Sequence, residues 1–155
     1  MYEGGLRVPF IAVGPRIKPG SQSRVPVTGL DLFPTLAELA GYAKPLPKSL
    51  DGGSLTRLLR NQGQGAVQRS NSFLLFHQAV ARTAQTALIH GDYKLVKTWR
   101  GNRLELFDLS KSVEEDINLA EKLPGKTEEL HGLMTGHLDN VGAETRKITT
   151  KKVNQ

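Results

Sequence analysis

Apolar positions follow two different patterns along the chain, and the first covers roughly residues 1–60. Residues 8–13 are almost continuously apolar and end at Gly14, which predicts a buried strand of a parallel sheet covered on both faces. Prolines and glycines predict a loop over 16–27. A helix is expected between Asp31, a good N-cap, and Gly41, a good helix end. Its apolar face would consist of Leu32, Leu36, Leu39 and Ala40.

Beyond residue 72 the pattern changes to short β-rich runs separated by turn residues. Such runs occupy 73–77, 86–90, 93–99 and 104–109. The Gly91-Asp92 pair between the second and third runs is a two-residue hairpin signal. Together the runs predict four strands of an antiparallel sheet. Thr127 is then expected to cap a last helix. The apolar side of this helix comprises Leu130, Leu133, Met134, Leu138 and Val141.

The remaining residues up to 71 follow neither of these two apolar patterns. Residues 42–53 hold two prolines and two glycines and predict a connector. Ser54 is expected to cap a short helix that contains Leu55, Leu58 and Leu59. Residues 61–71 are polar and glycine-rich, which is typical of an internal boundary.

The expected fold class is therefore α/β (α+β), with three parts. The first part, 1–62, is the end of an α/β domain and includes the terminal strand and helix of its sheet. The second, 63–143, is a subdomain with a small four-stranded antiparallel sheet and a C-terminal helix. The third, 144–155, is a flexible basic tail.

Composition narrows the classes of function. The chain has 155 residues, no cysteine and a formal net charge of +6. The lack of cysteine excludes a disulfide scaffold and thiolate metal sites. No apolar run reaches the roughly 18–20 residues of a membrane span. The basic tail has no aromatic residue for base stacking, so we expect no nucleic-acid partner. Mild basicity equally suits an anionic ligand such as a sulfated or phosphorylated sugar.

The residues by themselves predict no complete active site. The sequence has no GxGxxG, Walker or HExxH motif. The acidic run 114–116 predicts a solvated turn that caps a short helix over 117–123, in preference to a metal site. His131 and His137 are six residues apart on the last predicted helix, so they do not share one of its faces.

A series of short phrases is more specific than composition. Residues 2–10 read YEGGLRVPF, and they are followed in order by GPRIKPG at 14–20, DLFPTL at 31–36 and LDGGSL at 50–55. Farther along come GDYKLV at 91–96, LELFDL at 104–109 and NLA at 118–120. In this order the phrases resemble the C-terminal portion of the type I sulfatases, a family with an alkaline-phosphatase-like fold.

The resemblance implies which parts of a sulfatase lie elsewhere. In the family, a Cys or Ser of a Cys/Ser-x-Pro-x-Arg motif becomes formylglycine, a calcium ion polarises the sulfate, and these elements precede the YEGG segment. The resemblance therefore implies that the chain corresponds to the last third of a sulfatase, cut just downstream of the catalytic lysine. We expect no catalytic residue, metal ligand or cofactor within it. Calcium and formylglycine are expected only in the full-length parent, and the 155 residues alone should be inactive.

Two residues are candidates for contact with substrate, which would be a sulfated small molecule or glycan. His77 stands where many members carry a His after an apolar strand, in a loop that can reach the pocket mouth. Arg7 matches the family's Arg, either in a structural ion pair or in contact with sulfate. One departure is that many members have Arg where this chain has Ile89, one residue before His90.

Two alternatives remain open at this point. The chain can be a free-standing module that binds anionic glycans, or the same segment of a phosphatase or phosphonate hydrolase of the superfamily. The resemblance implies a periplasmic or secreted parent, because family members are commonly exported. The oligomeric state stays open.

Overall fold

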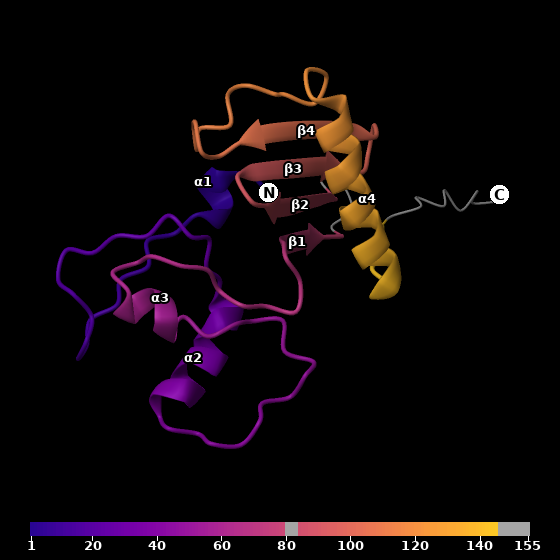
Figure 1. Cartoon of the computed structure of the whole chain (residues 1–155). Coiled ribbons are helices and arrows are strands. Elements are labelled where there is room, and N and C mark those ends of the chain that lie inside the picture. Colours follow the sequence, from indigo (N-terminus) through magenta and orange to yellow (C-terminus); the bar gives the residue numbers. More distant parts are fainter. Residues whose placement is uncertain (80–83, 146–155) are drawn as a thin grey trace, which may run out of the picture. The chain divides into compact units, whose positions relative to one another are not determined.

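The structure, a computed structural model, describes residues 1–79 and 84–145 (Figure 1). It divides into two compact units. The sheet unit comprises Met1–Val8 and the chain from Phe73 onward, and the helical unit comprises Pro9–Ser72. The sheet unit holds α1 (Glu3–Leu6), β1 (Leu74–Gln78), β2 (Gln85–His90), β3 (Tyr93–Thr98), β4 (Arg103–Asp108) and α4 (Pro124–Asn140). The helical unit holds the 3-10 turn η1 (Gly29–Asp31), α2 (Leu32–Leu39) and α3 (Thr56–Arg60).

The four strands pair antiparallel in chain order, which confirms the predicted sheet. The predicted hairpin is present, because His90 lies opposite Tyr93 across a two-residue turn. Gly91 has a φ of 59° in this turn, a conformation that glycine adopts without steric cost. Successive side chains of each strand point to opposite faces of the sheet.

Both faces of the sheet are covered within the sheet unit. Helix α4 lies across one face, as Figure 1 shows. The core under α4 comprises Leu88, Leu95, Leu106, Leu130, Met134 and Leu138. The core on the other face comprises Ala87, Val96 and Phe107, packed against Met1, Tyr2 and Leu6. The first eight residues thus form a third layer, and β2 and β3 are buried on both sides.

A buried lysine ties this third layer to the sheet. Lys94 of β3 is fully buried, and its Nζ lies 2.8 Å from Glu3 Oε1 and 2.8 Å from Glu115 Oε1. The backbone N–H of Glu3 donates to Glu115 Oε2 at 2.6 Å. Arg7 closes the network from the outside, because its guanidinium binds Glu3 Oε2 at 2.6 Å. Two carboxylates and two cations therefore balance within one cluster.

The helical unit is organised around a buried aspartate. Asp31 is completely buried, and its carboxylate accepts from Arg69 through Nε at 2.8 Å and Nη2 at 2.7 Å. It also accepts the backbone N–H groups of Thr28 and Gly53, at 2.8 and 2.9 Å. A Cβ at Gly53 would lie 2.1 Å from the carbonyl oxygen of Gln68, so only glycine fits there. A bidentate arginine with two further donors satisfies the buried charge.

Three of the predicted helices exist, as α2, α3 and α4, but their predicted caps are wrong. Asp31 makes no cap hydrogen bond to α2, because its carboxylate turns back to Thr28 and across to Arg69. Helix α4 begins at Pro124 rather than near Thr127, whose hydroxyl donates to the carbonyl oxygens of Ala120 and Leu123. Proline is favoured in the first turn, where its missing N–H costs nothing.

The predicted burial of two helix faces is also partly wrong. The face of α2 that carries Leu32, Leu36 and Leu39 is 42 to 62% exposed. On the last helix, Leu130, Met134 and Leu138 are buried as predicted, but Val141 is 61% exposed beyond the end of α4. The periodicity correctly predicted apolar faces, whereas burial also requires a partner surface.

The predicted strand over residues 8–13 is wrong. These residues adopt no strand, and Ile11 and Val13 are 84% and 93% exposed. A continuous apolar run signals burial, but a strand also needs a hydrogen-bonded neighbour. The sheet that the structure describes consists of β1 to β4 only. The predicted loop over 16–27 is confirmed.

The predicted helix over 117–123 is wrong, and the predicted solvated turn at 114–116 is wrong for Glu115. Glu114 and Asp116 are exposed, but the side chain of Glu115 is 5% exposed and pairs with Lys94. Residues 117–123 form no helix; Asn118 and Leu119 bond instead to the backbone of Leu106 in β4, and a single turn follows. The Asn118 side chain accepts the N–H of Leu106, and Leu119 donates to the Leu106 carbonyl.

The domain boundaries expected at 62/63 and 143/144 stay a prediction. The compact units are divided differently, since residues 1–8 contact the sheet and the change near residue 72 follows the polar stretch 61–71. From residue 146 the predicted basic tail lies outside the described residues.

Removing the shared cation should destabilise the sheet unit. We expect Lys94→Met to lower the free energy of unfolding by about 3–5 kcal/mol, because it leaves two buried carboxylates without their cation. The matched control is Lys111→Met, since the Lys111 side chain is 79% exposed where it pairs with Asp108 and exposed pairs contribute about 0–1 kcal/mol. Urea unfolding followed by circular dichroism measures both variants. Equal losses would contradict a structural role for the cluster.

Acid should destabilise the chain through the same carboxylates. Burial alone would raise the pKa of Glu3 and of Asp31, but hydrogen bonds from Lys94 and Arg69, respectively, outweigh it, and both pKa values lie below their ordinary 4.5 and 3.8. The unfolded chain then binds these protons at higher pH than the folded chain. Their contribution is complete above those ordinary values and is lost as the pH falls through the folded pKa values. The urea midpoint of the wild type should fall as the pH is lowered from 6 to 2. The midpoint of Asp31→Asn should fall less steeply over the same range. A midpoint that rises on acidification would contradict this.

Candidate functional site

The predicted substrate residue His77 lies on β1 and faces α4. In the strand register it pairs with Thr86, and Thr86 pairs with Lys97. His77 Nδ1 lies 2.8 Å from Thr86 Oγ1, and the indole Nε1 of Trp99 donates to the same oxygen at 2.8 Å. Three strands thus bring these polar side chains into one row. The predicted strand over 73–77 is confirmed as β1, so His77 lies within the sheet and not in the loop that the resemblance implied.

Hydrogen-bond chemistry fixes the tautomer of His77. An indole N–H can only donate, so Thr86 Oγ1 accepts from Trp99 and its own proton is free to go to His77 Nδ1. The other ring nitrogen, Nε2, lies 3.2 Å from the backbone carbonyl oxygen of Glu144, which can only accept. Neutral His77 therefore carries its proton on Nε2. Both ring nitrogens are occupied by protein groups.

A buried lysine extends the row. Lys97 is 3% exposed, its Nζ donates to Asn102 Oδ1, and it lies 5.6 Å from the centre of the Trp99 ring. Burial lowers the pKa of Lys97. Burial and the nearby Lys97 charge also lower the pKa of His131 on α4. This end of the sheet is thus electropositive and holds His131 in its neutral form more readily.

The second predicted residue, Arg7, lies on the other side of the sheet. It binds Glu3 in the Lys94 cluster, and its side chain is 53% exposed. Strand alternation places Lys94 and Lys97, three residues apart on β3, on opposite faces. The structure therefore does not bring His77 and Arg7 together. The structural ion pair that was one of the two predictions for Arg7 is present. Contact of His77 or Arg7 with substrate stays a prediction.

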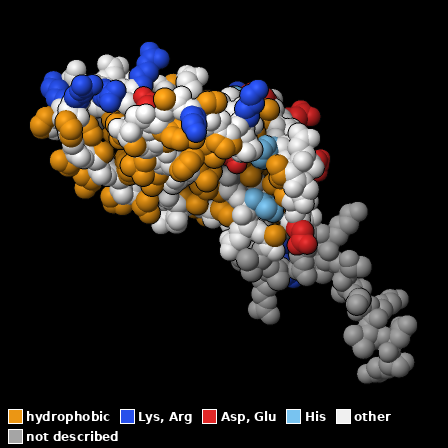
Figure 2. Space-filling view, turned by 90° about the horizontal axis from the view of Figure 1, so that it is seen from below, with side chains coloured by type: hydrophobic (Ala, Val, Ile, Leu, Met, Phe, Trp, Pro, Cys, Tyr) orange, Lys and Arg blue, Asp and Glu red, His pale blue; other side chains and the backbone are white. Residues whose placement is uncertain are grey.

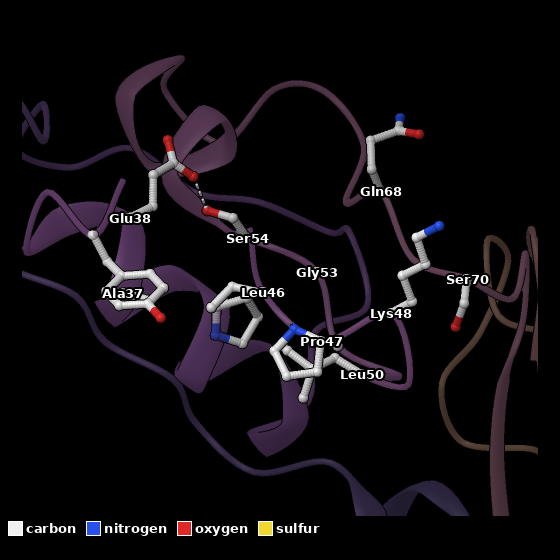
Figure 3. Close-up of a pocket in the computed structure, with 13 residues that line it drawn as sticks. Ala37, Glu38, Leu46, Pro47, Lys48, Leu50, Gly53, Ser54, Gln68 and Ser70 are labelled. Carbon is white, nitrogen blue, oxygen red and sulfur yellow. Dashed lines mark hydrogen bonds between the residues drawn. The ribbon is translucent and has the colours of Figure 1, made fainter. Parts of the chain in front are cut away.

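The helical unit contains a separate pocket of about 420 Å³ (Figure 3). Figure 3 shows Glu38 and Ser54 at one side and Lys48, Gln68 and Ser70 at the other. The Ser54 hydroxyl donates to the Glu38 carboxylate and accepts the N–H of Thr56. The predicted cap is wrong, because the N-cap of α3 is Leu55, although Ser54 accepts the N–H of Thr56, the first residue of the helix. No histidine among the lining residues could activate Ser54 as a nucleophile.

The described parts of the chain contain neither a candidate metal site nor a helix that could span a membrane. Within residues 1–79 and 84–145, no three His, Cys, Asp or Glu side chains are grouped so that they could hold a metal ion. The helices of these residues are all too short or too polar to cross a membrane.

Comparison with known proteins identifies the family. The sequence model of the family described as N-sulphoglucosamine sulphohydrolase, C-terminal, matches residues 1–143. The chain belongs to this sulfatase family, which confirms the resemblance seen in the short phrases.

Curated relatives agree with this family and show how much of a sulfatase is present. Arylsulfatase K of Xenopus laevis is 34% identical over 138 residues, which cover 84% of this chain and 25% of the relative. A sulfatase of Formosa agariphila is 35% identical over 136 residues, which cover 81% of this chain and 25% of the relative. The chain therefore spans about a quarter of the length of these relatives.

Solved structures confirm the fold class. A protein solved with its substrate D-glucosamine-2-N,6-O-disulfate superimposes with a TM-score of 0.63 at 21% identity, covering 81% of this chain and 26% of that one. A structure described as a 2-O GAG sulfatase has a TM-score of 0.55 at 28% identity, covering 72% and 24%. These similarities place the chain in the mixed α/β fold of the sulfatases.

Calcium and formylglycine, which the family implies, do not fit the residues present. The sequence has no cysteine and no Ser-x-Pro-x-Arg to convert. The clustered carboxylates that the structure describes, Glu3 and Glu115, are already paired with Lys94 and, for Glu3, also with Arg7. We therefore derive no step through either group.

Sequence reasoning missed the residues that surround the two candidates. Lys94, Lys97 and Glu115 were not singled out for burial, because charged side chains are normally exposed. One signal was available: the register of the β2–β3 hairpin places Thr86 beside Lys97.

Thr86 should be essential to the polar row. We expect Thr86→Val to cost about 1–3 kcal/mol of unfolding free energy, because it leaves the Trp99 N–H and His77 Nδ1 without a partner. Exchange of the Trp99 indole proton, followed by NMR, should become faster. Thr135→Val is the control, since its hydroxyl bonds only to carbonyls of its own helix. Unchanged indole exchange in Thr86→Val would contradict the assigned network.

Proposed function

We propose that this chain works as the C-terminal part of a longer sulfatase that hydrolyses sulfate esters, either of sulfated carbohydrate or of aryl sulfates. In this proposal it supplies structural support and part of the active-site rim, and it is inactive by itself. The observation that carries the proposal is the family match over residues 1–143, combined with coverage of only a quarter of the relatives' length.

The surface of the helical unit supports a role as part of a larger body. Figure 2 shows hydrophobic side chains gathered over a large part of the visible face. Ile11, Phe33 and Leu36 are 84%, 57% and 62% exposed. Soluble monomers rarely expose extended apolar surface, which is costly in water. Residues 8–13 and the exposed face of α2 would be buried against the rest of the sulfatase.

The relatives support the proposed substrate class. One structure that is 28% identical to this chain is described as a 2-O GAG sulfatase. In our proposal His77 contacts the substrate by giving up its bond to the Glu144 carbonyl. Arg7 would either contact the sulfate group directly or have only a structural role through its ion pair with Glu3. The parent's calcium and formylglycine belong to this proposal and are held outside the present residues.

Hydrolysis should require the upstream part of the protein. We expect the 155-residue chain to release no sulfate from an aryl sulfate, while a longer polypeptide that includes the Cys/Ser motif releases it. The measurement is the rate of phenol release, with the corresponding aryl phosphate as a control substrate. Turnover by the short chain would contradict the proposal. Preference of the longer polypeptide for the phosphate would also contradict it.

Contact of His77 with substrate can be separated from a structural role. In the longer sulfatase we expect His77→Gln to lower kcat/KM for a sulfated sugar about tenfold or more, mainly through KM, because a hydrogen bond to a charged group is lost. The control is His137→Gln. The His137 ring packs edge-on against Phe73, so this substitution should leave kcat and KM unchanged. Equal effects of the two variants would contradict a substrate role for His77.

A further inference from the structure

Strand β3 carries two buried lysines whose surroundings differ. Lys94 and Lys97 are 0% and 3% exposed, and they lie on opposite faces of the sheet. Lys94 pairs with two carboxylates at 2.8 Å. Lys97 takes part in none of the ion pairs between described residues. Because a lysine is almost never fully buried unless it is paired, the burial of Lys97 needs a separate reason.

The groups that contact the Lys97 ammonium are neutral. Its Nζ donates to Asn102 Oδ1 and lies 5.6 Å from the centre of the Trp99 ring. An ammonium has three N–H donors, and the hydrogen bonds between described residues occupy one of them. Burial lowers the pKa of Lys97, which means that its surroundings disfavour the charged form. The charge of Lys97 therefore lowers the stability of the folded state.

Lys97 lies in the same cross-strand row as His77. The register pairs His77 with Thr86 and Thr86 with Lys97, so His77 and Lys97 are two strand spacings apart, or about 10 Å. Trp99, whose ring lies next to the ammonium, donates to the Thr86 hydroxyl that occupies His77 Nδ1. Lys97 can thus act on the surroundings of His77 through its charge and through the indole. Charged groups in unfavourable surroundings cluster at functional sites.

We propose that Lys97 is a positioning residue of the site at His77. Its charge favours an anionic substrate group at the Nε2–H of His77, and its contact with Trp99 keeps the imidazole oriented for that bond. The inference rests on the proposed contact of His77 with substrate, and it adds a residue that does not itself touch the substrate. At about 10 Å and an effective dielectric constant of about 20, two opposite unit charges attract each other enough to change binding about tenfold.

A purely structural role makes the opposite prediction for stability. Lys94→Met removes a cation on which two buried carboxylates depend, so it should destabilise the chain. Lys97→Met removes a buried cation that pairs with no carboxylate in the described part of the chain. Methionine is flexible enough to fill the space, so the unfolding temperature should stay the same or rise. Asn102, the acceptor left behind, is exposed and can bond to water instead.

The first measurement compares the 155-residue wild type with Lys97→Met and with the control Lys111→Met, which removes a lysine that is 79% exposed. Thermal unfolding measures stability, and an NMR titration follows His131. Burial and the Lys97 charge both lower the pKa of His131, so its titration should move to higher pH in Lys97→Met only. An unmoved His131, or a loss of stability like that of Lys94→Met, would overturn the inference.

The second measurement uses the longer sulfatase and a sulfated sugar. We expect Lys97→Met to raise KM about three- to tenfold, because solvent screens part of the attraction, and to leave kcat within about twofold. Lys111→Met should change neither. Lys97→Arg keeps the charge and the contact with an aromatic ring, so it should restore KM to within about twofold of the wild type.

Two failures of the kinetic experiment are distinguishable. An unchanged KM in Lys97→Met, with an active wild type, would overturn the inference alone. A longer wild-type protein that hydrolyses no sulfate ester would contradict the proposed function, on which the inference rests.

Discussion

One buried ion cluster holds the sheet unit together, and the rest of that unit depends on it. Lys94 pairs with Glu3 from the start of the chain and with Glu115 from the segment after β4. Two segments more than a hundred residues apart in sequence are thereby fixed on one strand. An isolated buried charge would be strongly unfavourable, so each member requires the others. This mutual requirement explains why both carboxylates are buried although neither lies in a strand.

The cluster also explains how the third layer is retained. Residues 1–8 bury only a few apolar side chains against Phe107 and Val96, a small area for a segment that includes one short helix. The ion pairs and the N–H bond from Glu3 to Glu115 supply the directional contacts that fix its register. In the helical unit Asp31 has the comparable role, because five hydrogen bonds from three residues converge on one carboxylate. Both units are thus fixed by buried carboxylates, and both should weaken in acid.

Local signals account for what could be predicted from the sequence. The β2–β3 hairpin was predicted because Gly91 and the β-rich runs on either side of it encode it within a few residues. The helix face of Leu130, Met134 and Leu138 followed from its spacing. The strand over 8–13 failed because pairing depends on a neighbour that those residues do not specify. The burial of Lys94 and Glu115 was not predicted, because it arises only when distant segments meet. The hydrogen-bond partners of His77 were not predicted for the same reason.

The free energies of two hydrogen bonds indicate whether His77 can contact a substrate from its present position. Its Nε2 proton now meets a neutral backbone carbonyl, that of Glu144, and a bond of this kind contributes about 1 kcal/mol net. A sulfate oxygen would replace it by a bond to a charged group, which contributes about 1.5–3 kcal/mol. Under the proposed substrate role, this exchange would therefore be favourable. Thr86 already occupies Nδ1, so the ring would stay oriented while Nε2 changed its partner.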